Sequence, residues 1–119
     1  IHEKKTGRLL SAACELGAVL AGADPGRREA AARYGASLGV LFQIADDLLD
    51  VTATASVLGK STGKDEAQEK LTYVSVYGIS GAVAEREKAL AATLSRAGEL
   101  EGAPGLLAAL AEYAGHRDR

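Results

Sequence analysis

Residues 38–51 leave this sequence few choices of fold. When they are wound as an α-helix, their apolar side chains cover about 200° of its surface. The remaining side chains, Gln43, Asp46, Asp47 and Asp50, fall together within about 100° of that surface. The pattern therefore predicts a largely buried helix that carries one acidic stripe.

This acidic stripe requires positive charge nearby. Asp46 and Asp50 lie at positions i and i+4 of the expected helix, where like charges repel each other. Three carboxylates that project in one direction suit a hard divalent cation, and Mg²⁺ fits best because it retains waters and shares its coordination shell with substrate phosphates. The motif taken alone is equally compatible with neutralisation by a Lys or Arg of a neighbouring helix, or with simple exposure to water.

The composition narrows the class of protein. Ala, Leu, Glu, Lys and Arg are abundant, strand signals are lacking, and 119 residues suffice for one all-α domain with a buried core. The net charge of −2, without a basic arm, argues against nucleic acid as a partner. No apolar run reaches the roughly 20 residues of a transmembrane segment. A single Cys excludes an internal disulfide and fits a reducing compartment, so we expect a cytoplasmic location, with an organelle as the alternative.

Helix signals divide the chain into an antiparallel helical bundle. We expect helices over residues 1–21, 25–52, 70–77, 81–97 and 104–115, with a loop over 52–66 and a turn over 98–102. Asp24 followed by Pro25 is a strong start signal for the second helix. The faces expected to point inward are Leu9, Leu10, Ala13, Leu16, Gly17 and Leu20 in the first helix, and Leu106, Leu107, Leu110, Tyr113 and Ala114 in the last.

A strip of small residues precedes the acids on the second helix: Ala32, Gly35, Ala36 and Gly39. Small side chains allow a second helix to approach closely. They also leave space for a groove that could hold the apolar tail of a ligand. The sequence leaves both alternatives open.

Three separated segments together resemble the C-terminal part of a trans-type isoprenyl diphosphate synthase. The first is His2-Glu3-Lys4-Lys5-Thr6-Gly7-Arg8-Leu9 with Gly17-Ala18, the second is Phe42-Gln43-Ile44-Ala45-Asp46-Asp47-Leu48-Leu49-Asp50-Val51, and the third is Leu58-Gly59-Lys60, Gly63-Lys64-Asp65 and Lys70-Leu71-Thr72-Tyr73. The resemblance is close over the first 80 residues and limited to helical character after them. It implies that residues 1–119 form a single all-helical fragment, the C-terminal part of a prenyl synthase domain with the isoprenoid synthase fold.

The resemblance also implies a site. In that family, Mg²⁺ ions clamp an allylic diphosphate between two aspartate-rich motifs, of which this chain shows the second. Asp46 would be the main metal ligand, and Asp47 and Asp50 would act directly or through waters. Lys5 and Lys60 would hold the departing diphosphate, with Lys70 close to it, while Thr6 and Gln43 would line the site near the ionising carbon. Isopentenyl diphosphate would attack the resulting allylic cation, and a proton would then be lost.

The first aspartate-rich motif of the family, and the arginines that accompany it, do not occur in these 119 residues. We therefore expect this chain to carry half of the metal and diphosphate site and to be inactive alone. We also expect self-association, such as a homodimer, through apolar faces that upstream helices would cover. Two further readings stand beside a prenyl-elongating enzyme: a non-catalytic regulatory or structural subunit of such an enzyme, and a helical interaction module with a coincidental motif.

Overall fold

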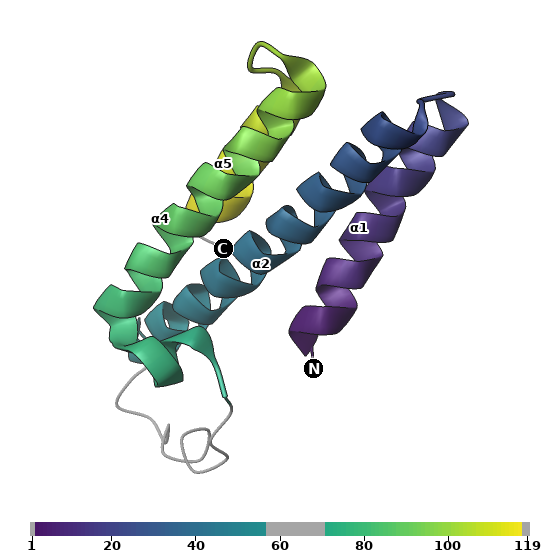
Figure 1. Ribbon diagram of the computed structural model, residues 1–119. Coiled ribbons are helices and arrows are strands. Elements are labelled where there is room, and N and C mark those ends of the chain that lie inside the picture. Colours follow the sequence, from purple (N-terminus) through teal and green to yellow (C-terminus); the bar gives the residue numbers. More distant parts are fainter. Residues whose placement is uncertain (1, 57–70, 118–119) are drawn as a thin grey trace.

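The computed structural model describes residues 2–56 and 71–117, and it describes side chains for residues 5–53 and 71–117. Within this part the chain is all-α, as predicted, with helices α1 (His2–Leu20), α2 (Pro25–Ser56), α4 (Tyr73–Glu101) and α5 (Leu106–His116). Successive helices run in alternating directions, which confirms the predicted antiparallel bundle (Figure 1). No described helix combines the length and the apolar character that crossing a bilayer requires.

Helix α2 is the centre of the bundle, because it packs against each of the other three helices. Its Tyr34, Leu38 and Leu41 are buried together with Leu90 and Ala97 of α4 and with Ala111 and Ala114 of α5. The Tyr34 hydroxyl donates a hydrogen bond of 2.8 Å to the carbonyl of Leu107. Burial raises the pKa of Tyr34 to about 12, because the charged phenolate is disfavoured away from water.

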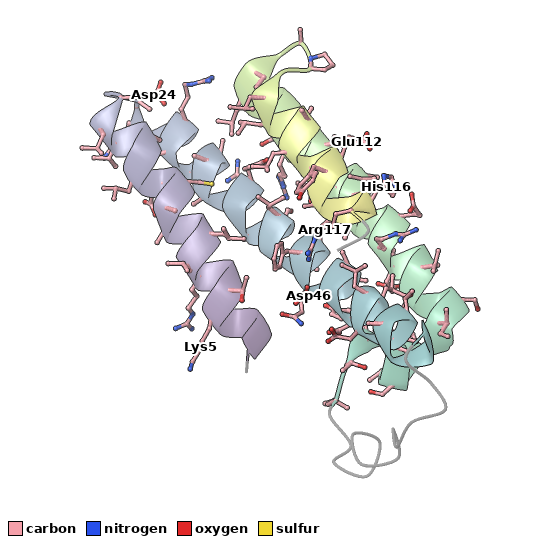
Figure 2. All side chains as sticks on the ribbon, turned by 180° about the vertical axis from the view of Figure 1, so that it is seen from behind. Lys5, Asp24, Asp46, Glu112, His116 and Arg117 are labelled. Atoms are coloured by element: carbon pink, nitrogen blue, oxygen red, sulfur yellow. The ribbon has the colours of Figure 1, made fainter. Side chains whose placement is uncertain are left out.

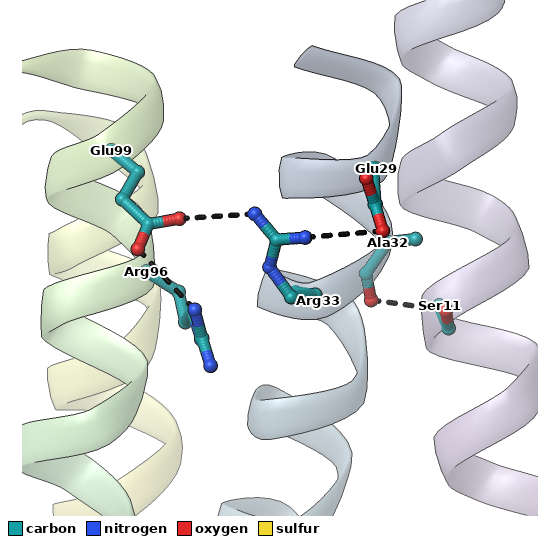
Figure 3. A network of polar contacts seen from close by, with 6 residues as sticks. All are labelled: Ser11, Glu29, Ala32, Arg33, Arg96 and Glu99. Atoms are coloured by element: carbon teal, nitrogen blue, oxygen red, sulfur yellow. Dashed lines mark hydrogen bonds and ion pairs between the residues drawn. The ribbon is translucent and has the colours of Figure 1, made fainter. Parts of the chain in front are cut away.

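Helix α1 lies unusually close to α2. A Cβ atom placed on Gly35 would lie 2.5 Å from the carbonyl oxygen of Leu10, and one on Gly39 would lie 2.7 Å from the Cα of Gly7. At the same crossing, the Ser11 hydroxyl donates to the carbonyl of Ala32 at 3.0 Å (Figure 3). The small residues of α2 therefore serve close helix packing, and the alternative of a ligand groove is wrong at Gly35 and Gly39.

The start of α2 agrees with the sequence, but its end does not. Asp24 caps the helix, since its side chain accepts a 2.8 Å hydrogen bond from the backbone N–H of Arg27. The helix then continues to Ser56, past the expected loop start at Thr52. Thr52 fits inside the helix because its hydroxyl donates to the carbonyl of Leu48, one turn back, at 3.1 Å. The rest of the expected loop lies outside the described residues.

Helix α4 begins at a capping box. The Thr72 hydroxyl accepts from the backbone N–H of Ser75 at 3.0 Å, and the Ser75 hydroxyl accepts from the N–H of Thr72 at 2.8 Å. Gly78 (φ 77°, ψ 171°) interrupts the helix, so the predicted separation of a short first segment from the main helix is confirmed. The predicted turn over residues 98–102 is wrong, because α4 continues to Glu101 and ends at Gly102, which has φ 76°.

The large apolar residues of α1 and α5 are less buried than we expected. Leu106, Leu110 and Tyr113 are exposed, as are Leu9, Leu16 and Leu20, whereas Leu10 and Cys14 of α1 pack against the core. Of the α5 residues expected to point inward, Ala114 is buried and Leu107 packs against the core, as predicted. The other buried residues of α5 are also small, namely Ala111 and Gly115. A Cβ atom on Gly115 would already lie 3.3 Å from Leu41. Close approach of α5 to α2 therefore selects the narrow face of α5 over its bulkier one.

Ion pairs add a polar link between α2 and α4. Arg33 lies 3.4 Å from Glu29 on its own helix and 3.7 Å from Glu99 on α4, and Arg96 lies 3.3 Å from Glu99 (Figure 3). All of these side chains are substantially exposed, and such pairs contribute little to stability, about 0–1 kcal/mol each. The bundle is therefore held mainly by the apolar contacts around α2.

We predict that Gly35→Ala destabilises the fold by about 1–3 kcal/mol, because its methyl group would meet the Leu10 backbone, which cannot rotate away. Urea unfolding followed by circular dichroism measures the change. Gly17→Ala is the matched control: Gly17 is a helical glycine with nothing within 4 Å of its added Cβ atom, so stability should be unchanged or rise by about 0.5–1 kcal/mol. Equal effects of the two substitutions would contradict the close crossing.

Candidate metal site

The four polar residues of the expected stripe fall in different surroundings on α2. Asp50 is exposed, Asp46 and Gln43 are half-buried, and Asp47 is buried with a relative exposure of 6%. The core side of α2 here consists of Leu41, Ile44 and Ala45, as the periodicity predicts, but Phe42 is 37% exposed. The predicted acidic stripe is therefore divided, with Asp47 turned toward α4 and the other two acids nearer to solvent.

Asp47 joins α2 to the beginning of α4. Its Oδ2 accepts a 2.9 Å hydrogen bond from the backbone N–H of Tyr73, and its Oδ1 accepts a 3.1 Å bond from the side-chain amide of Gln43. The N–H of Tyr73 belongs to the first turn of α4, where backbone donors lack partners within the helix. A carboxylate at this end of a helix is favoured by the helix dipole as well. These contacts give Asp47 a structural function, and its role as a metal ligand stays a prediction.

Asp46 has a cationic partner from the other end of the chain. The Arg117 Nη2 atom lies 2.9 Å from the Asp46 Oδ1 atom, and the side chain of Arg117 is only 12% exposed while that of Asp46 is 46% exposed. The Cζ atom of Arg117 also lies 4.2 Å from the ring centroid of Phe42, within the range of a cation–π contact. Figure 2 shows Arg117 reaching from the end of α5 to Asp46 on α2. One alternative left open by the sequence, an arginine from a neighbouring helix, is thus present at Asp46.

The fit to Mg²⁺ differs among the three acids. Asp46 and Asp50 are carboxylates one helical turn apart with access to solvent, which suits a cation that commonly binds one or two protein carboxylates and completes its shell with water and phosphate oxygens. Asp47 fits less well, because both of its oxygens already accept hydrogen bonds. Among the described side chains, those of residues 5–53 and 71–117, no group of three or more His, Cys, Asp or Glu is placed to hold a metal ion.

The other predicted site residues are only partly accounted for. Lys5 is exposed at the N-terminal end of α1 and extends away from Asp46 in Figure 2, and Thr6 beside it is half-buried. Gln43 lies on α2 one turn before Asp47 and positions that carboxylate. Lys60 and Lys70 lie outside the described residues. The approach of these lysines to the acids of α2 therefore stays a prediction.

Arg117 was missed from the sequence, because it follows the predicted end of the last helix at residue 115. Its placement depends on contacts distant in sequence: Gly115 packs on Leu41, and His116 lies 3.4 Å from Glu87 on α4. The available signal was Phe42 and Asp46, spaced i and i+4, which offer a cation an aromatic face and a carboxylate on the same side of one helix. That signal is too common on helices to identify its partner.

The chain is similar to a known protein family and to several curated proteins. The family model described as Polyprenyl synthetase matches residues 1–104. A geranylgeranyl pyrophosphate synthase, chloroplastic, from Capsicum annuum is 40% identical over 126 residues, covering 99% of this chain and 32% of the relative. A dimethylallyltranstransferase from Fischerella ambigua (strain UTEX 1903) is 40% identical over 113 residues, covering 95% of this chain and 33% of the relative.

A third relative, a geranylgeranyl diphosphate synthase from Cyanophora paradoxa, is 45% identical over 87 residues, covering 73% of this chain and 29% of the relative. The chain thus spans about a third of the length of the curated relatives it matches. The search of solved structures found no match.

We predict that Asp47→Ala destabilises the fold by about 1–3 kcal/mol in metal-free buffer, because it leaves the Tyr73 N–H without its charged acceptor. Urea unfolding in the presence of EDTA measures this loss. Glu15→Ala is the control, since it removes one exposed carboxylate from α1 and should change stability by less than about 0.5 kcal/mol. If the two variants were equally stable, Asp47 would not anchor α4.

Proposed function

We propose a function on the basis that the chain belongs to the polyprenyl synthetase family, whose model it matches over residues 1–104. The protein that contains this chain condenses an allylic diphosphate with isopentenyl diphosphate in a Mg²⁺-dependent prenyl elongation. The chain supplies the helix with the second aspartate-rich motif. The observation that carries the proposal is 40% identity over 99% of the chain to a protein named geranylgeranyl pyrophosphate synthase.

The residues of α2 suit the diphosphate end of this reaction. Asp46 and Asp50 would hold Mg²⁺ at the edge of α2, and the bound ion would supply the positive charge that stabilises the departing diphosphate. Asp47 and Gln43 hold each other and the first turn of α4 in place beside that edge.

The lysines would serve the same leaving group as point charges. Lys5 is exposed and would turn toward the diphosphate once substrate is bound, with Lys60 and Lys70 contributing from the segment before α4. Thr6 is half-buried on the same turn of α1, where its hydroxyl oxygen would face the ionising carbon together with the amide of Gln43. Ionisation that leaves diphosphate needs cations directed at that group more than it needs a base.

A second candidate function is a non-catalytic regulatory or structural subunit of a prenyl synthase. Two observations favour it: Asp46 is paired with Arg117, and Asp47 is fully engaged by Gln43 and Tyr73. Such a subunit would bind a partner, would keep the acids for packing and would not need to bind metal itself. The two candidates therefore differ in whether Asp46 binds Mg²⁺ with diphosphate.

We predict that the chain binds Mg²⁺ together with inorganic diphosphate, and that Asp46→Ala weakens this binding by more than about tenfold. The reason is that removing even a partner of a metal ligand commonly costs 10–100-fold in affinity. Isothermal titration calorimetry measures both affinities, and Glu15→Ala controls for the loss of one negative charge. Equal binding by the Asp46→Ala variant and the unaltered chain would favour the non-catalytic subunit.

We further predict that the 119-residue chain alone forms no prenyl product, since it would supply only one of the two aspartate-rich motifs. We also predict that it self-associates through its exposed apolar side chains on α1 and α5. A radiolabelled isopentenyl diphosphate assay and light scattering at high concentration measure these two properties. Product formation would overturn the first expectation, and a monomer would overturn the second.

A cytoplasmic location remains our expectation for the whole protein, and the word chloroplastic in the Capsicum annuum relative's name keeps an organelle as the alternative.

A further inference from the structure

The C-terminal end of the described chain is held against the proposed metal ligand. Arg117 follows the last residue of α5, and its extended backbone (φ −65°, ψ 153°) directs it to α2. There its guanidinium group lies 2.9 Å from Asp46 and 4.2 Å from the ring centroid of Phe42. Phe42 and Asp46 are one turn apart on the same helix, so they form a receptor with an aromatic face and a carboxylate. We call these two residues and Arg117 the C-terminal latch.

This latch is more than a loose surface pair. The side chain of Arg117 is 12% exposed, and an arginine with so little water around it gains more from a carboxylate and an aromatic ring than an exposed one does. The preceding residues fix its position, because Gly115 lies against Leu41, and His116 lies 3.4 Å from Glu87 and 3.5 Å from Glu112. Arg117 is therefore delivered to Asp46 by the packing of α5.

A divalent cation and this guanidinium group compete for the same carboxylate. Mg²⁺ binds carboxylate oxygens at about 2.0–2.1 Å, and a guanidinium group 2.9 Å from Asp46 Oδ1 would then lie close to a doubly charged ion. The two cations repel each other at that separation, and an acid shared between them satisfies neither fully. Occupation of Asp46 by one cation therefore lowers the affinity of the other.

We propose that Arg117 is an internal counter-ion that competes with the metal for Asp46, so that metal binding releases the C-terminal end of α5 from α2. The inference rests on the proposed function, since it takes Asp46 to be a metal ligand. Linkage requires the effect to be reciprocal: the latch weakens metal binding by the same factor by which metal weakens the latch. The binding of a metal ion to Asp46 is thereby coupled to the order of the last turn of α5.

The test measures Mg²⁺ affinity by calorimetry for the full chain and three variants. Arg117→Gln removes the competing charge and should tighten Mg²⁺ binding about tenfold, within the 5–150-fold range typical of coupled sites. Arg117→Lys retains a cation and should shift the affinity less. Arg96→Gln removes a cation from α4, where it pairs with Glu99, and should leave the affinity unchanged.

A second measurement uses the unaltered chain and so does not depend on how the variants fold. Hydrogen exchange of the backbone amides over residues 114–116 should become faster when Mg²⁺ is added, because the latch opens. Asp46→Asn should abolish this acceleration. Exchange that stays the same or slows while Mg²⁺ binds would overturn the latch.

The outcomes separate this inference from the proposed function. If the chain binds Mg²⁺ and Arg117→Gln binds it with equal or lower affinity, the competition is absent and the latch is overturned, while Asp46 remains a metal ligand. If neither the chain nor any variant binds Mg²⁺, the metal assignment of Asp46 fails and the inference fails with it. If Arg117→Gln binds Mg²⁺ more tightly than the unaltered chain does, and added Mg²⁺ speeds exchange in the unaltered chain, both the inference and the proposed function are supported.

Discussion

The burial of the Leu41 side of α2 is the interaction on which the other features depend. Leu41 is fully buried and lies against Gly115 of α5, while its neighbours Tyr34 and Leu38 pack in the same core with residues of α4 and α5. On the opposite side, Gly35 and Gly39 let the backbone of α1 come close. The three acids of residues 46–50 meet different surroundings on this helix: Asp47 is buried, Asp46 is half-buried and Asp50 is exposed. The contacts of each acid follow from its place on α2.

Asp46 and Asp47 each have partners in the protein that offset the cost of burying their negative charge. Asp47 is turned inward and accepts hydrogen bonds from a backbone N–H and an amide, and Asp46 is half-buried beside an arginine. A buried carboxylate without such partners would be strongly destabilising, whereas a paired one is tolerated. The fold thus stabilises the acidic edge with its own groups, and a metal with diphosphate would have to offer Asp46 more than Arg117 does.

The positions of the helices could be predicted from the sequence better than the contacts between them. Periodicity and the Asp24 cap predicted the central helix, because a strong apolar pattern and a start signal are local properties. The outward position of Leu106 and Tyr113 was not predictable in this way, since α5 has both a bulky apolar face and a narrow one, and only the distance to Leu41 decides between them. The pairing of Asp46 with Arg117 joins residues 71 positions apart, and no local pattern indicates such a contact.

The break at Gly78 gives the first turn of α4 a degree of mechanical independence. Residues 73–77 are tied to α2 through the bond between Asp47 and the Tyr73 N–H, and they form a short separate turn in Figure 1. The positive φ of Gly78 interrupts the helical hydrogen bonds that would otherwise connect this turn rigidly to residues 79–101. If Asp47 moved, residues 73–77 would therefore move with it, while residues 79–101 of α4 stayed packed against the core through Leu90 and Ala97.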